Sequence, residues 1–231
     1  MASFSGNLFG TEQDRVNCSF YLKIGACRHG DRCSRKHIKP QFSQTICLPN
    51  VYNNPAHTPE GQNMSNAELQ ADFDRFYEDF FIELAKYGNV LEMIVCDNVG
   101  DHLLGNVYAK YEYEAEAARA VRELNDRWYA MRPLLCELSP VTDFRESCCR
   151  QNEMGECKRE GFCNFMHLCH PTKSLVGAIQ ASQRVSRRHN RNKSHEEGEN
   201  GGDMGWTPNA AGGQGWMPPA EDLGWMPGSR R

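Results

Sequence analysis

The chain has 231 residues, a formal net charge of −4 and 24% charged residues. This length suits one ordinary domain with smaller modules beside it. No stretch reaches the roughly 18 apolar residues that a membrane span needs. The N-terminal sequence Met-Ala-Ser-Phe-Ser-Gly-Asn-Leu also lacks the basic segment and apolar run of a signal peptide. We therefore expect no membrane association and no secretory leader.

The eleven cysteines carry the strongest signal. Two stretches repeat one pattern of three cysteines and a histidine: Cys18, Cys27, Cys33 and His37, then Cys149, Cys157, Cys163 and His167. Successive members are separated by 8, 5 and 3 residues in the first set and by 7, 5 and 3 in the second. Three thiolates and one imidazole form a closed tetrahedral zinc site of the structural type. The pattern therefore predicts two structural Zn²⁺ ions with no coordination position left for a substrate.

The second site has one ambiguous ligand, because Cys148 in place of Cys149 would restore the first gap to 8 residues. Spacing alone does not decide between the two. Cysteines that hold metal rather than disulfides indicate a reducing compartment, the cytosol or the nucleus.

Charge is partitioned along the chain. Residues 1–44 carry +4 and residues 142–193 carry +5, whereas residues 45–141 carry −9. Basic segments attract polyanions such as nucleic acid, and an acidic surface attracts basic protein segments. The zinc segments are thus the predicted nucleic-acid side, and the middle module is the predicted protein-binding side.

The predicted organisation has five parts: zinc finger 12–40, central module 43–141, zinc finger 143–170, a short helix (173–183) and basic run within 171–193, and a Gly/Trp/Pro-rich tail over 194–231. In the central module we expect strands at 45–48, 90–96, 106–113 and 134–138, and helices at 65–88 and 114–126. Ser65 and Glu68 form a capping box at the start of the first helix. This βαββαβ order predicts an α+β sandwich like an RNA-recognition motif.

The central sheet departs from an RNA-binding sheet. Such sheets carry aromatic side chains at set positions of the first and third strands, and here those positions hold Cys47, Asn106 and Tyr108. The first helix is also strongly acidic, with these carboxylates: Glu68, Asp72, Asp74, Glu78, Asp79 and Glu83. Either this is a solvated helix face or it docks a basic peptide. Trp128, in the loop after the second helix, favours a partner; packing on its own domain is the alternative.

The fingers carry basic and aromatic residues between their ligands. Finger 1 has Phe20, Tyr21, Lys23, Arg28, Arg32, Ser34, Arg35 and Lys36, and finger 2 has Arg150, Lys158, Arg159, Phe162, Asn164 and Phe165. Aromatic rings stack on unpaired bases, and arginine and lysine contact phosphates. These residues predict single-stranded RNA binding; fingers that only stabilise the domain are the alternative.

The tail is rich in glycine, proline and acidic residues, so we expect disorder from about residue 196. It repeats a Gly-Trp-X-Pro motif around Trp206, Trp216 and Trp225. The repeat is either a low-complexity tail without a single partner or a linear motif that places tryptophan in a partner's pocket.

Several runs of the chain resemble the small subunit of the U2 auxiliary factor (U2AF), a family of pre-mRNA splicing factors. They are Asn-Cys-Ser-Phe-Tyr at 17–21, Lys-Ile-Gly-Ala-Cys-Arg-His-Gly at 23–30, Cys-Asp-Asn at 96–98, Gly-Asp-His-Leu at 100–103 and Leu-Ser-Pro-Val-Thr-Asp-Phe-Arg-Glu at 138–146. The resemblance covers about residues 5–170. It implies a non-enzymatic nuclear protein of the spliceosome, and it favours Cys149 over Cys148 as the ligand.

The resemblance also implies partners. The central module would be a U2AF-homology motif that heterodimerises with the U2AF large subunit, and the fingers would recognise the AG dinucleotide of single-stranded pre-mRNA at the 3′ splice site. The protein would then help to recruit the U2 snRNP, and other spliceosomal proteins are further possible partners. Animal members have a long arginine–serine tail, and its absence here indicates a fungal-type member.

Site residues follow from the same comparison. Matching RNA-contact positions are Phe20, Arg28, Ser34, Arg35, Arg150 and Phe165, to which we add Tyr21 and Lys23 from composition. Matching partner-binding positions are Asp72, Phe76, Glu78, Asp79, Glu83, Arg127, Trp128 and Tyr129. Tyr129 stands where the family usually has phenylalanine.

Two other functions stay open on sequence grounds: a cytoplasmic zinc-finger regulator of mRNA turnover, and an interaction scaffold with purely structural fingers. An enzyme is the least expected, because both predicted zinc sites are full. We expect the two fingers to lie side by side against the central sheet, since one finger reads few nucleotides.

Overall fold

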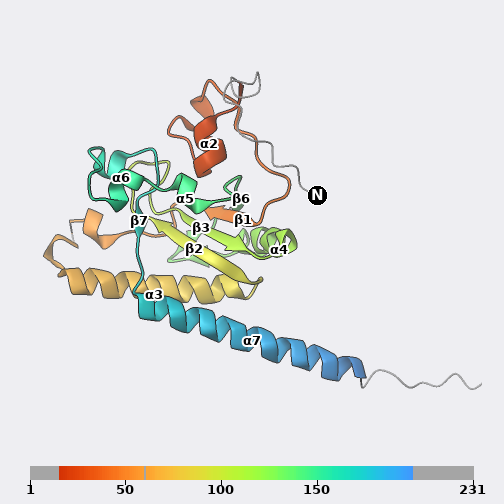
Figure 1. The fold of residues 1–231 in the computed structure, drawn as a ribbon. Helices are drawn as coiled ribbons and strands as arrows, with labels where there is room; N and C mark the ends of the chain where they lie inside the picture. Colours follow the sequence, from red (N-terminus) through yellow and green to blue (C-terminus); the bar gives the residue numbers. More distant parts are fainter. Residues whose placement is uncertain (1–15, 60, 200–231) are drawn as a thin grey trace, which may run out of the picture. The chain divides into compact units, whose positions relative to one another are not determined.

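The computed structural model describes residues 16–59 and 61–199, without the side chains of residues 62 and 190–199. Residues as far as Arg188 belong to one compact unit. Its centre is an antiparallel sheet with strand order β6-β1-β3-β2-β7 (Figure 1). The strands are β1 (Thr45–Leu48), β2 (Val90–Cys96), β3 (Val107–Tyr111), β6 (Glu137–Leu138) and β7 (Leu168–Cys169). The α+β fold predicted from the order of elements is confirmed.

Two helices, α3 (Asn66–Ala85) and α4 (Glu114–Leu124), pack against one face of this sheet. The predicted capping box is present at the start of α3, where the Ser65 side chain and Glu68 satisfy each other's backbone N–H groups. Phe80 and Leu84 recur at helical spacing and are buried in the core. Helix α3 ends at Ala85 and not at residue 88.

The opposite face of the sheet is covered by the fingers (Figure 1). Finger 1 contributes α2 (Ser19–Ile24) and a 3₁₀ turn at Gly30–Arg32. Finger 2 is preceded by α5 (Phe144–Ser147) and contributes α6 (Arg150–Glu153), a 3₁₀ turn at Glu160–Phe162 and strand β7. Its β7 pairs with β2, so finger 2 extends the central sheet by one strand.

The end of the central module differs from the prediction. A hairpin of β4 (Trp128–Tyr129) with β5 (Arg132–Pro133) precedes the predicted strand, and of residues 134–138 only the short β6 is a strand. The reason lies in competing bonds: the Cys136 N–H donates to Oδ1 of Asn125 at the end of α4, so it is not available to a neighbouring strand. The third strand (106–113) and second helix (114–126) are shorter than predicted, at 107–111 and 114–124.

Helix α7 (Lys173–Glu199) is longer than the predicted 173–183 and includes the basic run. Ile179 is buried in the core, and the Gln183 amide both accepts from the Val90 N–H at 3.0 Å and donates to its carbonyl oxygen at 3.0 Å. The helix continues to Glu199, a few residues past the point near residue 196 where disorder was expected to begin. Residues 200–231, with the tryptophan repeats, lie outside the described residues. Among the described helices, none has the length and apolarity to cross a membrane.

Candidate metal centres and nucleic-acid interface

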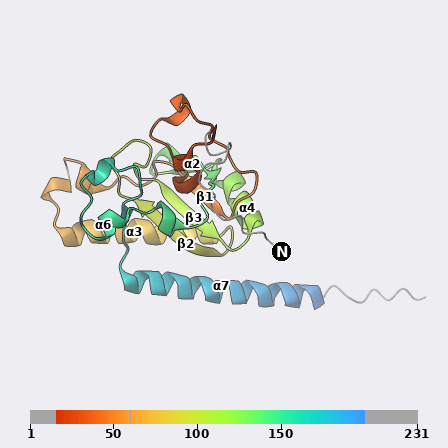
Figure 2. The same ribbon diagram turned by 45° about the horizontal axis from the view of Figure 1, so that its top comes forward.

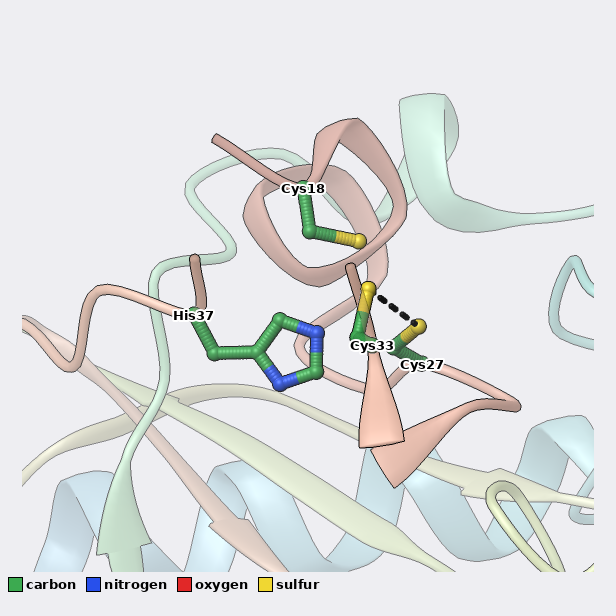
Figure 3. A group of neighbouring side chains, drawn as sticks. All are labelled: Cys18, Cys27, Cys33 and His37. Atoms are coloured by element: carbon green, nitrogen blue, oxygen red, sulfur yellow. Dashed lines mark hydrogen bonds between the residues drawn. The ribbon is translucent and has the colours of Figure 1, made fainter. Parts of the chain in front are cut away.

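The two predicted ligand sets each converge on one point. The donor atoms of Cys18, Cys27, Cys33 and His37 lie within 4.8 Å of one another, and so do those of Cys149, Cys157, Cys163 and His167. Figure 3 shows the first set with its three sulfurs and imidazole facing a common centre. The Sγ atoms of Cys27 and Cys33 are 3.9 Å apart, and those of Cys149 and Cys163 are 3.8 Å apart. In a tetrahedral thiolate site with metal–sulfur bonds of about 2.3 Å, two sulfur atoms lie about 3.8 Å apart.

The donor groups fit a bound cation. Nε2 of His37 and Nε2 of His167 are buried without a hydrogen-bond partner, which is costly for a polar atom unless a ligand satisfies it. Burial raises the pKa of Cys27 and the pKa of Cys149 to about 11. Without a cation these thiols would stay protonated at neutral pH, and a metal ion would hold them as thiolates.

Both fingers have the same backbone framework. The Cys18 N–H donates to the Lys36 carbonyl oxygen at 2.9 Å, and the Cys149 N–H donates to the Met166 carbonyl oxygen at 2.9 Å. In each finger a short helix follows the first cysteine and a 3₁₀ turn follows the second. The repeated spacing in the sequence therefore corresponds to a repeated fold.

The structure separates the neighbouring cysteines of finger 2. The cluster contains Cys149, whereas Cys148 belongs to the apolar cluster between finger 2 and the sheet, with Phe144 and Met166. Cys148 bridges to Met166 as Asn17 bridges to Lys36 in finger 1. Because successive residues in extended backbone point to opposite sides, only one of the two thiols faces the cluster.

Finger residues close the sheet face on which related domains stack bases. Tyr108 and Cys47, two of the expected stacking positions, are 0% and 4% exposed. They pack with Ile24 of finger 1 and Met166 of finger 2 in one apolar cluster. Gly25 makes this approach possible, since a Cβ on it would lie 2.5 Å from Oγ of Ser139. Nucleic acid is therefore excluded from this part of the sheet, and the fingers themselves offer the available surface.

The two fingers meet through their side chains. The rings of Phe20 and Phe165 lie edge to face with centroids 6.2 Å apart, and the Ser147 hydroxyl next to finger 2 donates to the Lys23 carbonyl oxygen. In Figure 2, α2 lies over β1, and α6 of finger 2 lies to the left of the strands. This is the side-by-side arrangement expected from the sequence.

The predicted RNA contacts differ in exposure. Those with exposed side chains are Phe20, Lys23, Arg28, Ser34, Arg35 and Arg150, and Phe165 is half-buried. Tyr21 is a correction: it is 7% exposed, and its ring stacks on the His37 imidazole with centroids 4.6 Å apart. Its face is covered by a ligand of the metal cluster, so Tyr21 supports the finger and is not accessible to a base.

The loop after β2 holds finger 2, and sequence reasoning missed this role. Asn98 is 1% exposed; its Nδ2 donates to the carbonyl oxygens of Cys163 at 3.2 Å and Phe165 at 3.0 Å, and its Oδ1 accepts from the His167 N–H at 2.8 Å. The Val99 N–H also donates to Gly161 at 2.8 Å. Nothing nearby in the sequence indicates that Asn98 has partners about 65 residues away.

The predicted partner-binding residues lie on α3 and at β4: Asp72, Phe76, Glu78, Asp79, Glu83, Arg127, Trp128 and Tyr129. Tyr129 packs on Phe76 and Phe80 with centroid distances of 5.9 and 5.5 Å. Arg127 forms an ion pair with Glu83. Trp128 is 69% exposed, so it does not pack into its own domain. Contacts and nearby charges thus group Asp72, Phe76, Asp79 and Glu83 of α3 with Arg127 and Tyr129. Glu78 is exposed on another side of the helix, since it lies two residues from Phe76.

Burial raises the pKa of Tyr129, and the neighbouring carboxylate of Asp79 raises it further. The hydroxyl therefore stays protonated at neutral pH and can donate a hydrogen bond to this surface.

The fold and the clusters define a class: a protein with two Cys₃His fingers packed on a domain like an RNA-recognition motif. The zinc-finger family model described as "C-x8-C-x5-C-x3-H type (and similar)" matches residues 13–39 and 143–168. Relatives are similar over most of the chain. The splicing factor U2AF 23 kDa subunit of Schizosaccharomyces pombe is 59% identical over 184 residues, 80% of this chain and 85% of the relative. The chain belongs to the family of U2AF small subunits.

Animal relatives give the same result. The Drosophila melanogaster splicing factor U2af 38 kDa subunit is 56% identical, covering 81% of this chain and 74% of the relative. The Rattus norvegicus U2AF 26 kDa subunit is 62% identical, covering 76% and 82%. These relatives confirm the predicted family and the splicing function, which was weighed against a role in mRNA turnover. Because fungal and animal relatives are similarly close, the fungal-type assignment stays a prediction.

Solved structures of RNA-recognition motifs also match at low similarity. The structure titled "Structure of Rna15 RRM with bound RNA (GU)" is 17% identical, with a TM-score of 0.29, and covers 49% of this chain and 95% of that chain. The RRM3 domain of Gbp2 is 15% identical, with a TM-score of 0.30, and covers 53% and 90%.

Proposed function

We propose that this splicing factor binds two structural zinc ions and uses both fingers to recognise the AG dinucleotide of pre-mRNA at the 3′ splice site. Three thiolates and an imidazole are a preferred zinc donor set. The ligands are Cys18, Cys27, Cys33 and His37 in finger 1, and Cys149, Cys157, Cys163 and His167 in finger 2. Each ion would fix short loops that have little core of their own.

The observation that carries RNA recognition is the contact between Phe20 and Phe165. The ring centroids of these two residues, one from each finger, are 6.2 Å apart. The pair lies beside basic segments, and the sheet below it is closed to bases. Stacking would hold unpaired bases. The remaining proposed contacts would bind phosphate and base edges: Lys23, Arg28, Ser34, Arg35 and Arg150. Splicing takes place in the nucleus, which is the location we propose.

The first test measures how tightly the zinc-loaded protein binds short RNAs that end in UAG or UCG, by fluorescence anisotropy at fixed salt. The protein is bound to a peptide of the U2AF large subunit, the partner proposed below. We expect UAG to bind much more tightly. Phe20→Ala should weaken UAG binding by about 1–3 kcal/mol, the range for one stacked base. Salt is fixed because phosphate contacts alone change affinity by orders of magnitude.

Phe42→Ala is the matched control, since Phe42 is another exposed aromatic (76%) but lies in the linker after finger 1. It should bind UAG as the unchanged protein does. Equal affinity for the two RNAs would contradict AG recognition and would favour fingers that contact only the phosphate backbone or serve as a scaffold.

We propose further that the surface on α3 and β4 binds a tryptophan-containing, basic segment of the U2AF large subunit. Charge supports this, because the carboxylates of Asp72 and Asp79 on α3 lie near Tyr129 and the central module carries −9. Exposed Trp128 supports it as well, since large exposed aromatics mark interaction sites. A heterodimer would bring the small subunit to the intron and help to recruit the U2 snRNP.

Trp128→Ala should weaken binding of a large-subunit peptide by about 2 kcal/mol or more, as expected for a central aromatic of an interface. Isothermal titration calorimetry measures this. Tyr113→Ala is the control, because Tyr113 is similarly exposed (57%) at the start of α4. The same loss in both variants, or none in either, would argue against this surface.

A further inference from the structure

The turn between β4 and β5 has a backbone that its own residues disfavour. Trp128 pairs with Pro133 and Tyr129 pairs with Arg132, which leaves a two-residue loop. Residue 130 is alanine with φ of 46°, and residue 131 is methionine with φ of 64°. Positive φ at both positions is typical of the type I′ hairpin turn, for which Asn-Gly is preferred. A Cβ in this region costs conformational energy, so the turn is strained.

The strained turn presents an apolar side chain to solvent. Met131 is 92% exposed, so its side chain makes little contact with the described part of the chain. Trp128 and Pro133 are opposite each other in the hairpin and therefore share one face. Tyr129 occupies the other face, where it packs on α3. The hairpin thus fixes itself to α3 on one side and displays Trp128 on the other, with Met131 at its tip.

Local stability does not explain this choice of residues. A turn selected for stability would have glycine at position 131, which removes the strain and the exposed apolar surface together. Strain that persists in a folded protein is found at sites of function. Methionine is also a flexible and polarisable side chain, suited to irregular apolar surfaces of a partner.

We infer that Met131 is a specificity-determining residue of the partner surface, where together with Trp128 it contacts an apolar side chain of the large-subunit segment. The inference rests on the heterodimer proposed above. Continuity with that surface identifies the occupant: Met131 is three residues from Trp128 on the same hairpin, and Arg127 at its base is paired with Glu83 of α3. The acidic side chains of α3 favour basic residues next to the apolar one.

The test separates the role of the side chain from that of the strain. We expect Met131→Gly, in the full chain, to raise the midpoint of thermal unfolding and to weaken binding of a large-subunit peptide about fivefold to tenfold. Ala130→Asn is the matched control: asparagine tolerates positive φ and keeps Met131, so it should raise the unfolding midpoint and leave peptide affinity unchanged. Circular dichroism confirms that each variant is folded, and Met131→Asn replaces Met131→Gly if the latter is not.

A contact between Met131 and the peptide also predicts coupling. Apolar residues of the peptide are replaced by alanine one at a time. One of these changes should weaken binding to the unchanged protein and have no effect on binding to the Met131→Gly protein. Unchanged affinity of Met131→Gly, with weakened binding of Trp128→Ala, would overturn the inference and leave the heterodimer surface intact. Unchanged affinity in both would contradict the proposed surface itself.

Discussion

Cys149→Ser is expected to lower the zinc content of the protein from two ions to one. Cys149 is one of four donors in the finger 2 cluster, and a structural zinc site contributes about 10–16 kcal/mol to the folding of such a small module. With the site incomplete, finger 2 should unfold locally and RNA binding should be lost. Zinc content is measured by atomic emission, and the state of finger 2 by amide hydrogen exchange of residues 149–167.

Cys148→Ser provides the matched control, because it makes the same change at the adjacent residue. Cys148 is buried against the sheet, outside the metal cluster, so this variant should keep two zinc ions and lose only some stability. The reverse result, with zinc lost from Cys148→Ser and retained in Cys149→Ser, would show that the ligand has been assigned to the wrong cysteine.

Asn98→Ala is expected to lower the free energy of unfolding by about 3 kcal/mol, at about 1 kcal/mol for each of three hydrogen bonds lost. The three bonds all join the central module to finger 2, at Cys163, Phe165 and His167. Two of these residues are members of the metal cluster, so the zinc of finger 2 should also be released faster to a chelator. Because Phe165 is no longer fixed beside Phe20, affinity for UAG RNA should fall.

Asn125→Ala tests whether this effect is specific. Asn125 also makes three bonds to backbone, donating to Val121 and Cys136 and accepting from the Cys136 N–H, but it holds the region before β6. Chemical denaturation should show destabilisation of this variant too, with zinc release from finger 2 unchanged. If both variants release zinc at the same rate, Asn98 has only a general stabilising role.

Local features of the sequence were sufficient for much of the fold. Strand β1 and strand β2 begin and end where alternation and turn residues predicted, and the capping box at Ser65 starts α3. The metal clusters were also predictable, since their spacing repeats along the chain. Strand ends, helix caps and ligand spacings depend on residues that are close in the sequence, and the tertiary contacts of the folded chain agree with them.

Long-range packing decided the rest. Tyr21 is an aromatic residue of the kind that contacts RNA, but it stacks on His37. The last predicted strand is reduced to Glu137–Leu138, because the Cys136 N–H bonds to Asn125.

The accessible nucleic-acid surface likewise depends on tertiary structure. Tyr108 is hidden from solvent by Ile24 and Met166, which are far apart in the sequence but pack in one cluster. The hydrogen bonds from Asn98 to finger 2 likewise join residues about 65 positions apart. The ligand spacing and the acidic helix therefore indicated the kind of chemistry. Only contacts between distant segments decided which side chains can perform it, because burial and hydrogen-bond partners are properties of the folded chain.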